Sequence, residues 1–146
     1  MAVKWVEYAT GKNIDAVLSE KGLSRNPDAF SDTGDPDILA AFALGITSGT
    51  GSGLFTPDGQ FSREQAATMI MNTCKAIGTD VGNPPASGFA DIGLASSWAV
   101  DGIGFVRANG IMQGTGDGNF SPKADYTREQ SIITFNNINH DALPGR

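Results

Sequence analysis

The sequence predicts a mainly α-helical protein built from repeats of helix, glycine-rich loop and helix. The first observation is an internal repeat, because residues 45–57 and 110–122 match in their glycines, phenylalanine and proline at one constant offset. The second is that each copy is followed by Ser/Thr-Arg-Glu-Gln, which has the spacing of a helix capping box. The third is that no segment offers a long alternating strand pattern.

Two short helices are predicted before the first full repeat. Apolar residues at helical spacing favour a helix over residues 1–10, which Gly11 would end. Asn13 is a suitable N-cap for a second helix over residues 14–21. A connection rich in Ser, Asn, Pro and Asp then leads into the repeat.

The first full repeat contains two predicted helices. Asp35 followed by Pro36 is a good helix start, because proline at the first helical position loses no needed hydrogen-bond donor. This helix is expected to end at Gly45, and the capping box at residues 62–65 should start another that runs to about Ile77. The residues expected on their buried faces are Ile38, Leu39, Phe42 and Ala43, and then Ala66, Met69, Ile70, Cys74 and Ile77.

The second full repeat has the same order with a longer spacing. Its first residue, Phe89, lies farther from its glycine loop than the equivalent Phe30 does. The helix before the loop is therefore expected to be longer, from about Ser97 to Asn109, and Thr127 should open the last helix. The residues expected to face inward are Trp98, Ala99, Ile103 and Val106, and then Ile132, Phe135 and Ile138.

The combined pattern resembles the S-layer homology domain of bacterial surface proteins. Its elements are Phe-x-Asp, Trp-Ala in a helix, Gly-Ile-x-x-Gly, a Gly-Asp-Gly-x-Phe-x-Pro loop and Thr-Arg-Glu at a helix start. Residues 89–139 carry almost all of these elements. Residues 30–78 carry the loop and Ser-Arg-Glu but lack the tryptophan.

The resemblance also implies an arrangement of the repeats. Members of this family usually carry three repeats around a pseudo-threefold axis, with the Thr-Arg-Ala-Glu helices as a central three-helix bundle. Residues 1–29 are accordingly interpreted as the tail of a truncated first repeat plus a connecting helix. A second repeat at 30–83 and a third at 84–146 would complete one compact domain. The three central helices would lie near residues 2–10, 63–77 and 128–139.

The function that the resemblance implies is non-covalent anchoring at the bacterial cell surface or cell wall. The partner would be an anionic secondary cell-wall polysaccharide, often recognised through a pyruvate ketal on an amino sugar, held in grooves between repeats. The glycan-binding residues carried over by resemblance are Arg128, Trp98, Asp91 and Gly114 in the third repeat, and Arg63 and Gly49 in the second.

These residue types suit the recognition of an acidic sugar. A guanidinium holds a carboxylate through two parallel hydrogen bonds, and the first turn of a helix adds free amides and the positive end of its dipole. A tryptophan such as Trp98 offers an apolar face to a pyranose ring, and loop glycines let a sugar approach the backbone closely.

Each of these residues also has a purely structural interpretation. The arginines could be solvated surface charges beside a helix cap, Asp32 and Asp91 could brace a turn, and Trp98 could belong to the core of an amphipathic helix. The corresponding alternative function is a degenerate module with a structural, protein-interaction or oligomerisation role and no glycan binding. The missing tryptophan of the second repeat and the truncated first repeat favour that alternative.

Other functional classes have little support in the sequence. A net charge of −6 with scattered Lys and Arg argues against nucleic-acid binding, and no apolar run or signal-peptide pattern predicts membrane insertion or export. The glycine loop carries one acidic residue, Asp117, which is too few for a calcium loop, and the lone His140 has no catalytic partners near it. We therefore expect no catalytic residues, no metal and no cofactor, and a monomer or weak oligomer.

Overall fold

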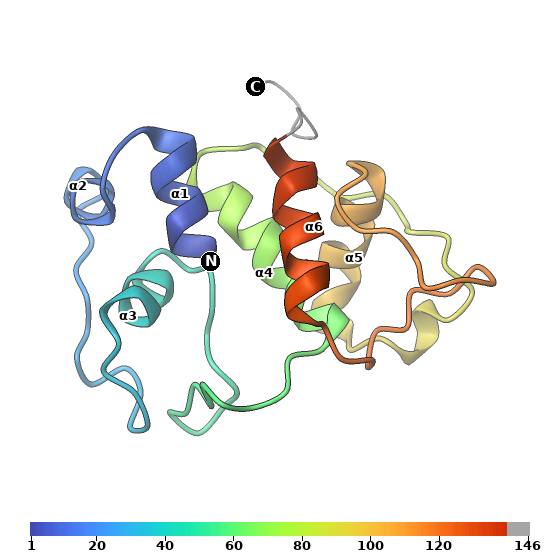
Figure 1. The fold of residues 1–146 in the computed structure, drawn as a ribbon, viewed down its shortest axis with the longest axis horizontal. Coiled ribbons are helices and arrows are strands. Elements are labelled where there is room, and N and C mark those ends of the chain that lie inside the picture. The colour runs from blue at the N-terminus through green and yellow to red at the C-terminus, as the bar shows by residue number, and fades with distance from the viewer. Residues whose placement is uncertain (140–146) are drawn as a thin grey trace. The chain divides into compact units, whose positions relative to one another are not determined.

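The computed structural model describes residues 1–139, without the side chains of Arg128 and Asn139 (Figure 1). Its helices in chain order are α1 (Ala2–Thr10), α2 (Ile14–Glu20), α3 (Pro36–Ala43), α4 (Arg63–Ala76), η1 (Ile92–Leu94), η2 (Ser97–Ala99), α5 (Val100–Ala108) and α6 (Arg128–Asn139), where η marks short 3-10 helices. Within this range, β pairing is limited to isolated bridges. The predicted mainly α class is confirmed, whereas His140 lies outside the described residues.

The chain divides into two compact units. The N-terminal unit comprises Met1–Gly59 and Ala76–Gly78, and the C-terminal unit comprises Gln60–Lys75 and the residues from Thr79 onward. The second repeat is thereby shared, because α3 and its glycine loop belong to the N-terminal unit and most of α4 belongs to the C-terminal unit.

The N-terminal unit is a cluster of the three helices α1, α2 and α3, each of which contacts the other two. The predicted helix ends are confirmed. Gly11 ends α1 in the left-handed conformation, Asn13 Oδ1 accepts from the Ala16 amide, and Asp35 Oδ1 accepts from the Asp37 and Ile38 amides. The buried side chains at the centre of this cluster are Val3, Trp5, Val6, Ile14, Val17, Leu18 and Leu39.

The C-terminal unit contains α4, α5 and α6. The segments that lead into α4 and α6 run beside each other, because Ser62 and Asp125 form an antiparallel bridge and the rings of Phe61 and Tyr126 pack edge to face with centroids 6.0 Å apart. Both predicted capping boxes are formed: the Gln65 amide donates to Ser62 Oγ (3.3 Å), and the Gln130 amide donates to Thr127 Oγ1 (3.1 Å).

The α5 helix approaches the backbone of α4 closely. A Cβ atom at Gly102 would lie 2.9 Å from the Cα of Thr68, so the contact depends on the absence of a side chain at Gly102. The fully buried side chains of α4 and α5 include Cys74, as predicted, together with Ile103 and Val106.

The predicted helix from about Ser97 to Asn109 is confirmed in extent, because η2 continues directly into α5, but its first turn is a 3-10 helix. α5 begins at Val100 and has 9 residues, against 8 in α3. The additional residues form η1 and η2, separated by Ala95 and Ser96 in extended conformations. The Ser96 amide donates to the Glu64 carboxylate (2.8 Å), which holds the extended segment between η1 and η2.

The predicted buried face of α6 is only partly correct. Ile138 is buried, but Ile132 is 56 % exposed, and its neighbour Ile133 is 61 % exposed. The second buried position is Thr134, one turn before Ile138, and its hydroxyl donates to the carbonyl of Gln130 (2.8 Å). Because that hydroxyl is satisfied within the helix, a polar residue can occupy the buried face that the hydropathy pattern assigned to isoleucine.

Candidate functional site

The glycine loops of the two repeats have the same backbone conformation. Each contains an isolated bridge, between Gly51 and Leu54 in one loop and between Gly116 and Asn119 in the other. Among residues 1–139, four non-glycine residues have positive φ angles, and they fall at equivalent positions of the two loops: Ser52 and Asp117, Thr56 and Ser121. The sequence repeat is therefore also a structural repeat, down to single backbone angles.

An aspartate at the start of each repeat braces the loop. Asp32 accepts from the amides of Phe55 (2.9 Å) and Thr56 (2.7 Å). Asp91 accepts from the amides of Phe120 (2.8 Å) and Ser121 (2.8 Å). Desolvation on its own would raise the pKa of Asp91, but these two amide donors hold that pKa below its usual value. The bracing role predicted as the structural alternative is confirmed, and a sugar contact at Asp91 stays a prediction.

Gly49 and Gly114 occupy the same tight position in the two loops. A Cβ at Gly49 would lie 2.4 Å from the Leu54 carbonyl oxygen, and one at Gly114 would lie 2.5 Å from the Asn119 carbonyl oxygen. The ring of the phenylalanine that starts each repeat also stands within 3 Å of that position. Internal packing of the loop therefore explains these two glycines, and their contact with a sugar is untested.

Arg63 is buried, with 5 % of its surface exposed, although it stands in the first turn of α4. Its Nε donates to the carbonyl of Phe120 (2.8 Å), its Nη2 donates to the carbonyl of Gln113 (2.6 Å), and its Cζ lies 4.6 Å from the centroid of the Phe120 ring. Burial lowers the pKa of Arg63. The alternative of a solvated surface charge is wrong, because this arginine of the second repeat clamps the glycine loop of the third.

The first amides of α4 are not free for a ligand, contrary to expectation. The Arg63 amide donates to the Ala124 carbonyl (2.9 Å) and the Glu64 amide donates to the Pro122 carbonyl (3.0 Å). The Gln65 amide is taken by the capping box. These bonds fasten the 122–124 segment of the third repeat across the start of α4, so these three amides are not available to an anion.

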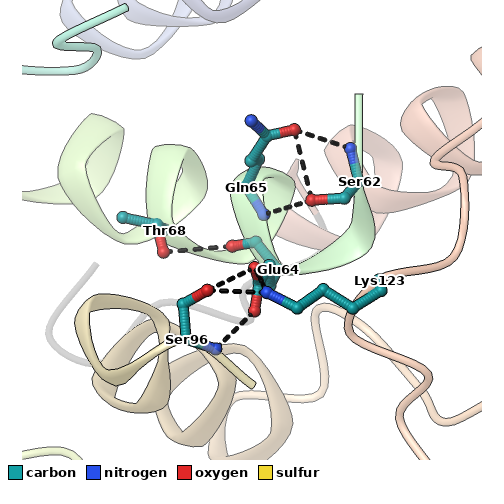
Figure 2. A network of polar contacts seen from close by, with 6 residues as sticks. All are labelled: Ser62, Glu64, Gln65, Thr68, Ser96 and Lys123. Carbon is teal, nitrogen blue, oxygen red and sulfur yellow. Dashed lines mark hydrogen bonds and ion pairs between the residues drawn. The ribbon is translucent and has the colours of Figure 1, made fainter. Parts of the chain in front are cut away.

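Glu64, Ser96 and Lys123 form a connected network beside the capping box (Figure 2). Glu64 is 3 % exposed, and its carboxylate accepts from the Ser96 amide (2.8 Å), the Ser96 hydroxyl (2.8 Å) and Lys123 Nζ (2.6 Å). Lys123 Nζ also donates to Ser96 Oγ (2.7 Å). Burial would raise the pKa of Glu64, but the Lys123 and Ser96 donors hold it below its usual value.

The sequence reasoning missed this network. One signal was available, because Lys123 occupies the loop position that Asp58 occupies in the earlier repeat, so the two loops differ in charge there. The part played by Ser96 could not be read from the sequence, since its partners lie far away along the chain.

Trp98 lies in η2 and is 55 % exposed. The interpretation of Trp98 as an inward-facing core residue is therefore wrong, and its ring is available to a ligand. Leu94, in η1 of the same segment, is also exposed. Arg128 begins α6, but its side chain lies outside the described residues, so its predicted glycan contact is untested.

The chain is a tandem-repeat module. Each of its two matching loops follows a Phe-x-Asp sequence and precedes a capped helix that starts with Ser/Thr-Arg-Glu. A family model of the S-layer homology domain matches residues 28–67 and 88–130, which together make up more than half of the chain. This chain belongs to the S-layer homology domain family.

Three curated relatives share a region of this chain. An endoglucanase of Bacillus sp. (strain KSM-635) is 32 % identical over 113 residues, which is 73 % of this chain and 12 % of the endoglucanase. The surface-layer 125 kDa protein of Lysinibacillus sphaericus is 30 % identical over 112 residues, which is 73 % of this chain and 9 % of that protein. An uncharacterized cell wall amidase of Bacillus anthracis is 31 % identical over 105 residues, which is 72 % of this chain and 19 % of the amidase.

This chain thus spans less than a fifth of the length of each of these relatives. The endoglucanase and the amidase match it only through their S-layer homology region. No solved structure matches the chain significantly.

Membership of the family identifies the chain as a cell-surface anchoring module of the bacterial cell surface or cell wall. The S-layer homology domain itself is non-catalytic. Among residues 1–139, every helix is too short or too polar to cross a lipid bilayer.

Proposed function

We propose that this module anchors its protein by binding an anionic secondary cell-wall polysaccharide non-covalently, in a groove between repeats. The observation that carries the proposal is the 55 % exposure of Trp98 in the third repeat, the repeat with the fuller family pattern. A large aromatic side chain left in solvent at the start of a packed helix is available as a platform for a sugar ring.

The other proposed site residues take different parts around that platform. In the third repeat, Asp91 and Gly114 hold the loop in the conformation that a sugar would meet, and Arg63 fixes the loop to α4 and contributes positive charge. Arg128 of the third repeat and Gly49 of the second repeat are proposed as further glycan contacts. Because the second repeat lacks the tryptophan, we propose that the third repeat carries most of the affinity.

The charge distribution supports local recognition of an acidic group. The chain carries a net charge of −6, so long-range attraction does not favour an anionic ligand. Arg63, in contrast, has no carboxylate oxygen within 4.0 Å among the described residues. Its nearest described partners are carbonyls and the Phe120 ring, and the Asp91 carboxylate interacts with it at longer range, so we propose a positive potential there for a nearby anion.

Sedimentation with purified peptidoglycan sacculi tests the proposal. The pure chain should sediment with intact sacculi from surface-layer-bearing bacteria and should stay in solution after mild acid has stripped their attached polysaccharide. Trp98→Ala should weaken sedimentation without lowering the melting temperature, since the ring is mostly exposed. Equal sedimentation with stripped and unstripped sacculi would refute glycan binding.

We also propose that the central helices of three repeats, the first of them truncated, share a pseudo-threefold axis in one compact domain with repeats at 1–29, 30–83 and 84–146. The antiparallel entry of α4 and α6 at Ser62 and Asp125 supports their equivalence. A crystal structure in which residues 2–10 pack away from the other two helices would contradict this arrangement.

A second candidate function is a protein-interaction or oligomerisation module. The exposed Ile132 and Ile133 on α6 favour it, since two adjacent apolar side chains in solvent suit a contact with another chain. Light scattering separates the candidates. A stable oligomer that dissociates in the Ile132→Glu variant, together with no binding to sacculi, would favour the protein-interaction module.

A further inference from the structure

We infer that Lys123 is the residue that binds the acidic group of the wall glycan directly, with Glu64 and Ser96 holding its ammonium in place (Figure 2). This inference rests on the proposed function and names the side chain that recognises the carboxylate. Neither the family pattern nor the loop repeat assigns a role to Lys123.

Lys123 combines exposure with a fixed position. Its side chain is 60 % exposed, whereas the Glu64 side chain that it contacts is 4 % exposed. The bonds to Glu64 Oε1 (2.6 Å) and Ser96 Oγ (2.7 Å) use two of the three ammonium donors. A lysine held in this way loses less conformational entropy when its remaining donor meets a ligand than a free surface lysine does.

Arg63 has little exposed surface for the same contact. Its Nε and Nη2 donate to the carbonyls of Phe120 and Gln113, and it is 5 % exposed. A carboxylate that took both of these donors would release the glycine loop from α4. Arg63 therefore serves as a clamp and as a source of positive potential, and the exposed cation next to it in the fold is Lys123.

Lys123 is the exposed charge of this cluster. Its partner Glu64 is buried, and the buried Arg63 interacts electrostatically with Asp91 without a carboxylate oxygen within 4.0 Å among the described residues. The 122–124 segment that carries Lys123 is fastened to the start of α4 by the amides of Arg63 and Glu64. The ammonium is consequently positioned by the backbone as well as by its side-chain partners.

The exposed Trp98 belongs to the same segment as the partners of Lys123. Ser96, which accepts from the ammonium, lies two residues before Trp98. The equivalent loop position in the second repeat is Asp58, and that repeat also lacks the tryptophan. The tryptophan and the lysine thus occur together in the third repeat, and both are missing from the second. A site for an acidic sugar needs the two groups together.

The test measures binding of the full chain to unstripped sacculi for the wild type and three variants. Lys123→Gln should weaken the apparent affinity about tenfold or more, because one hydrogen bond between charged groups is lost. Lys75→Gln, which removes the same charge from an exposed lysine at the other end of α4, should change it less than about twofold. Lys123→Arg should retain part of the affinity.

A change on the ligand completes the test. Sacculi whose carboxylates have been reduced with carbodiimide and borohydride should bind the wild type and Lys123→Gln equally, because the charge that distinguishes them is gone. Melting curves should show that Lys123→Gln is folded, because Glu64 still accepts from the amide and the hydroxyl of Ser96.

The outcomes separate the two proposals. If the wild type does not bind unstripped sacculi, the proposed function fails. If the wild type binds and Lys123→Gln matches Lys75→Gln, glycan binding stands and the role of Lys123 is overturned. An equal loss for Lys123→Gln on native and carboxyl-reduced sacculi would likewise overturn it, since the lysine would then act without a carboxylate partner.

Discussion

Replacing Arg63 by alanine should destabilise the C-terminal unit much more than replacing an exposed arginine of the same unit. Arg63 donates to two carbonyls, at 2.8 Å and 2.6 Å, and lies over the ring of Phe120. A hydrogen bond from a charged group contributes about 1.5 to 3 kcal/mol, and a cation–π contact contributes about 0.5 to 1 kcal/mol. Alanine also removes the cost of burying a guanidinium, so we expect the free energy of unfolding to fall by about 3 kcal/mol.

The matched control is Arg107→Ala. Arg107 is exposed, and its Cζ lies 4.1 Å from the centroid of the Phe89 ring, so it has the aromatic contact without the buried carbonyl clamp. Its loss should cost about 0.5 to 1 kcal/mol. The free energy of unfolding of Arg63→Lys should lie between those of Arg63→Ala and Arg107→Ala, because an ammonium keeps the charge but cannot present the same fork of donors.

Urea unfolding followed by far-ultraviolet circular dichroism would measure these free energies. A free energy of unfolding for Arg63→Ala within about 1 kcal/mol of that for Arg107→Ala would refute the clamp. In that case, the two carbonyls would be satisfied equally well by water, and Arg63 would be free to serve as a ligand contact.

Three further predictions concern pH, packing and capping. The lowered pKa of Asp91 means that the folded state binds protons less readily than the unfolded chain. The free energy of unfolding should therefore fall as the pH drops below about 4. Urea unfolding at a series of pH values should show a weaker pH dependence in this range for Asp91→Asn. Gly102→Ala should lower the free energy of unfolding, measured by thermal unfolding, by about 1 to 3 kcal/mol, because its Cβ would press on the backbone of Thr68. Gly93→Ala should lower it much less, because a Cβ at Gly93 would have nothing within 4 Å. Ser62→Ala should lower the free energy of unfolding by about 1 kcal/mol, since the Gln65 amide loses its acceptor, and a variant as stable as the wild type would show that water replaces the cap.

Local features of this fold could be predicted from the sequence because their causes lie within a few residues. The caps at Asn13, Asp35 and Ser62 each need one side chain and an amide two or three positions away. The left-handed helix end at Gly11 needs only the absence of a Cβ. The repeated loops could be matched for the same reason, since the glycine pattern and the aspartate brace recur together.

Features that depend on distant partners could not be predicted. The burial of Arg63 depends on carbonyls of the next repeat, and the extended segment between η1 and η2 depends on the Glu64 carboxylate that accepts from the Ser96 amide. The hydropathy pattern indicated that Ile132 and Trp98 lie on apolar helix faces, but which part of a face is covered is set by tertiary packing. The family pattern indicated the region of the site, whereas the exposure and contacts of Trp98 and Lys123 came from the structure.

Titration of the pure chain with polysaccharide released from sacculi by mild acid, followed by isothermal calorimetry, tests the central claim most directly. Glycan anchoring predicts saturable binding with a defined stoichiometry, weakened by Trp98→Ala and by removal of the acidic groups of the polysaccharide. The absence of any binding heat at all temperatures and salt concentrations, with a chain shown to be folded, would contradict the claim and favour the structural or protein-interaction module.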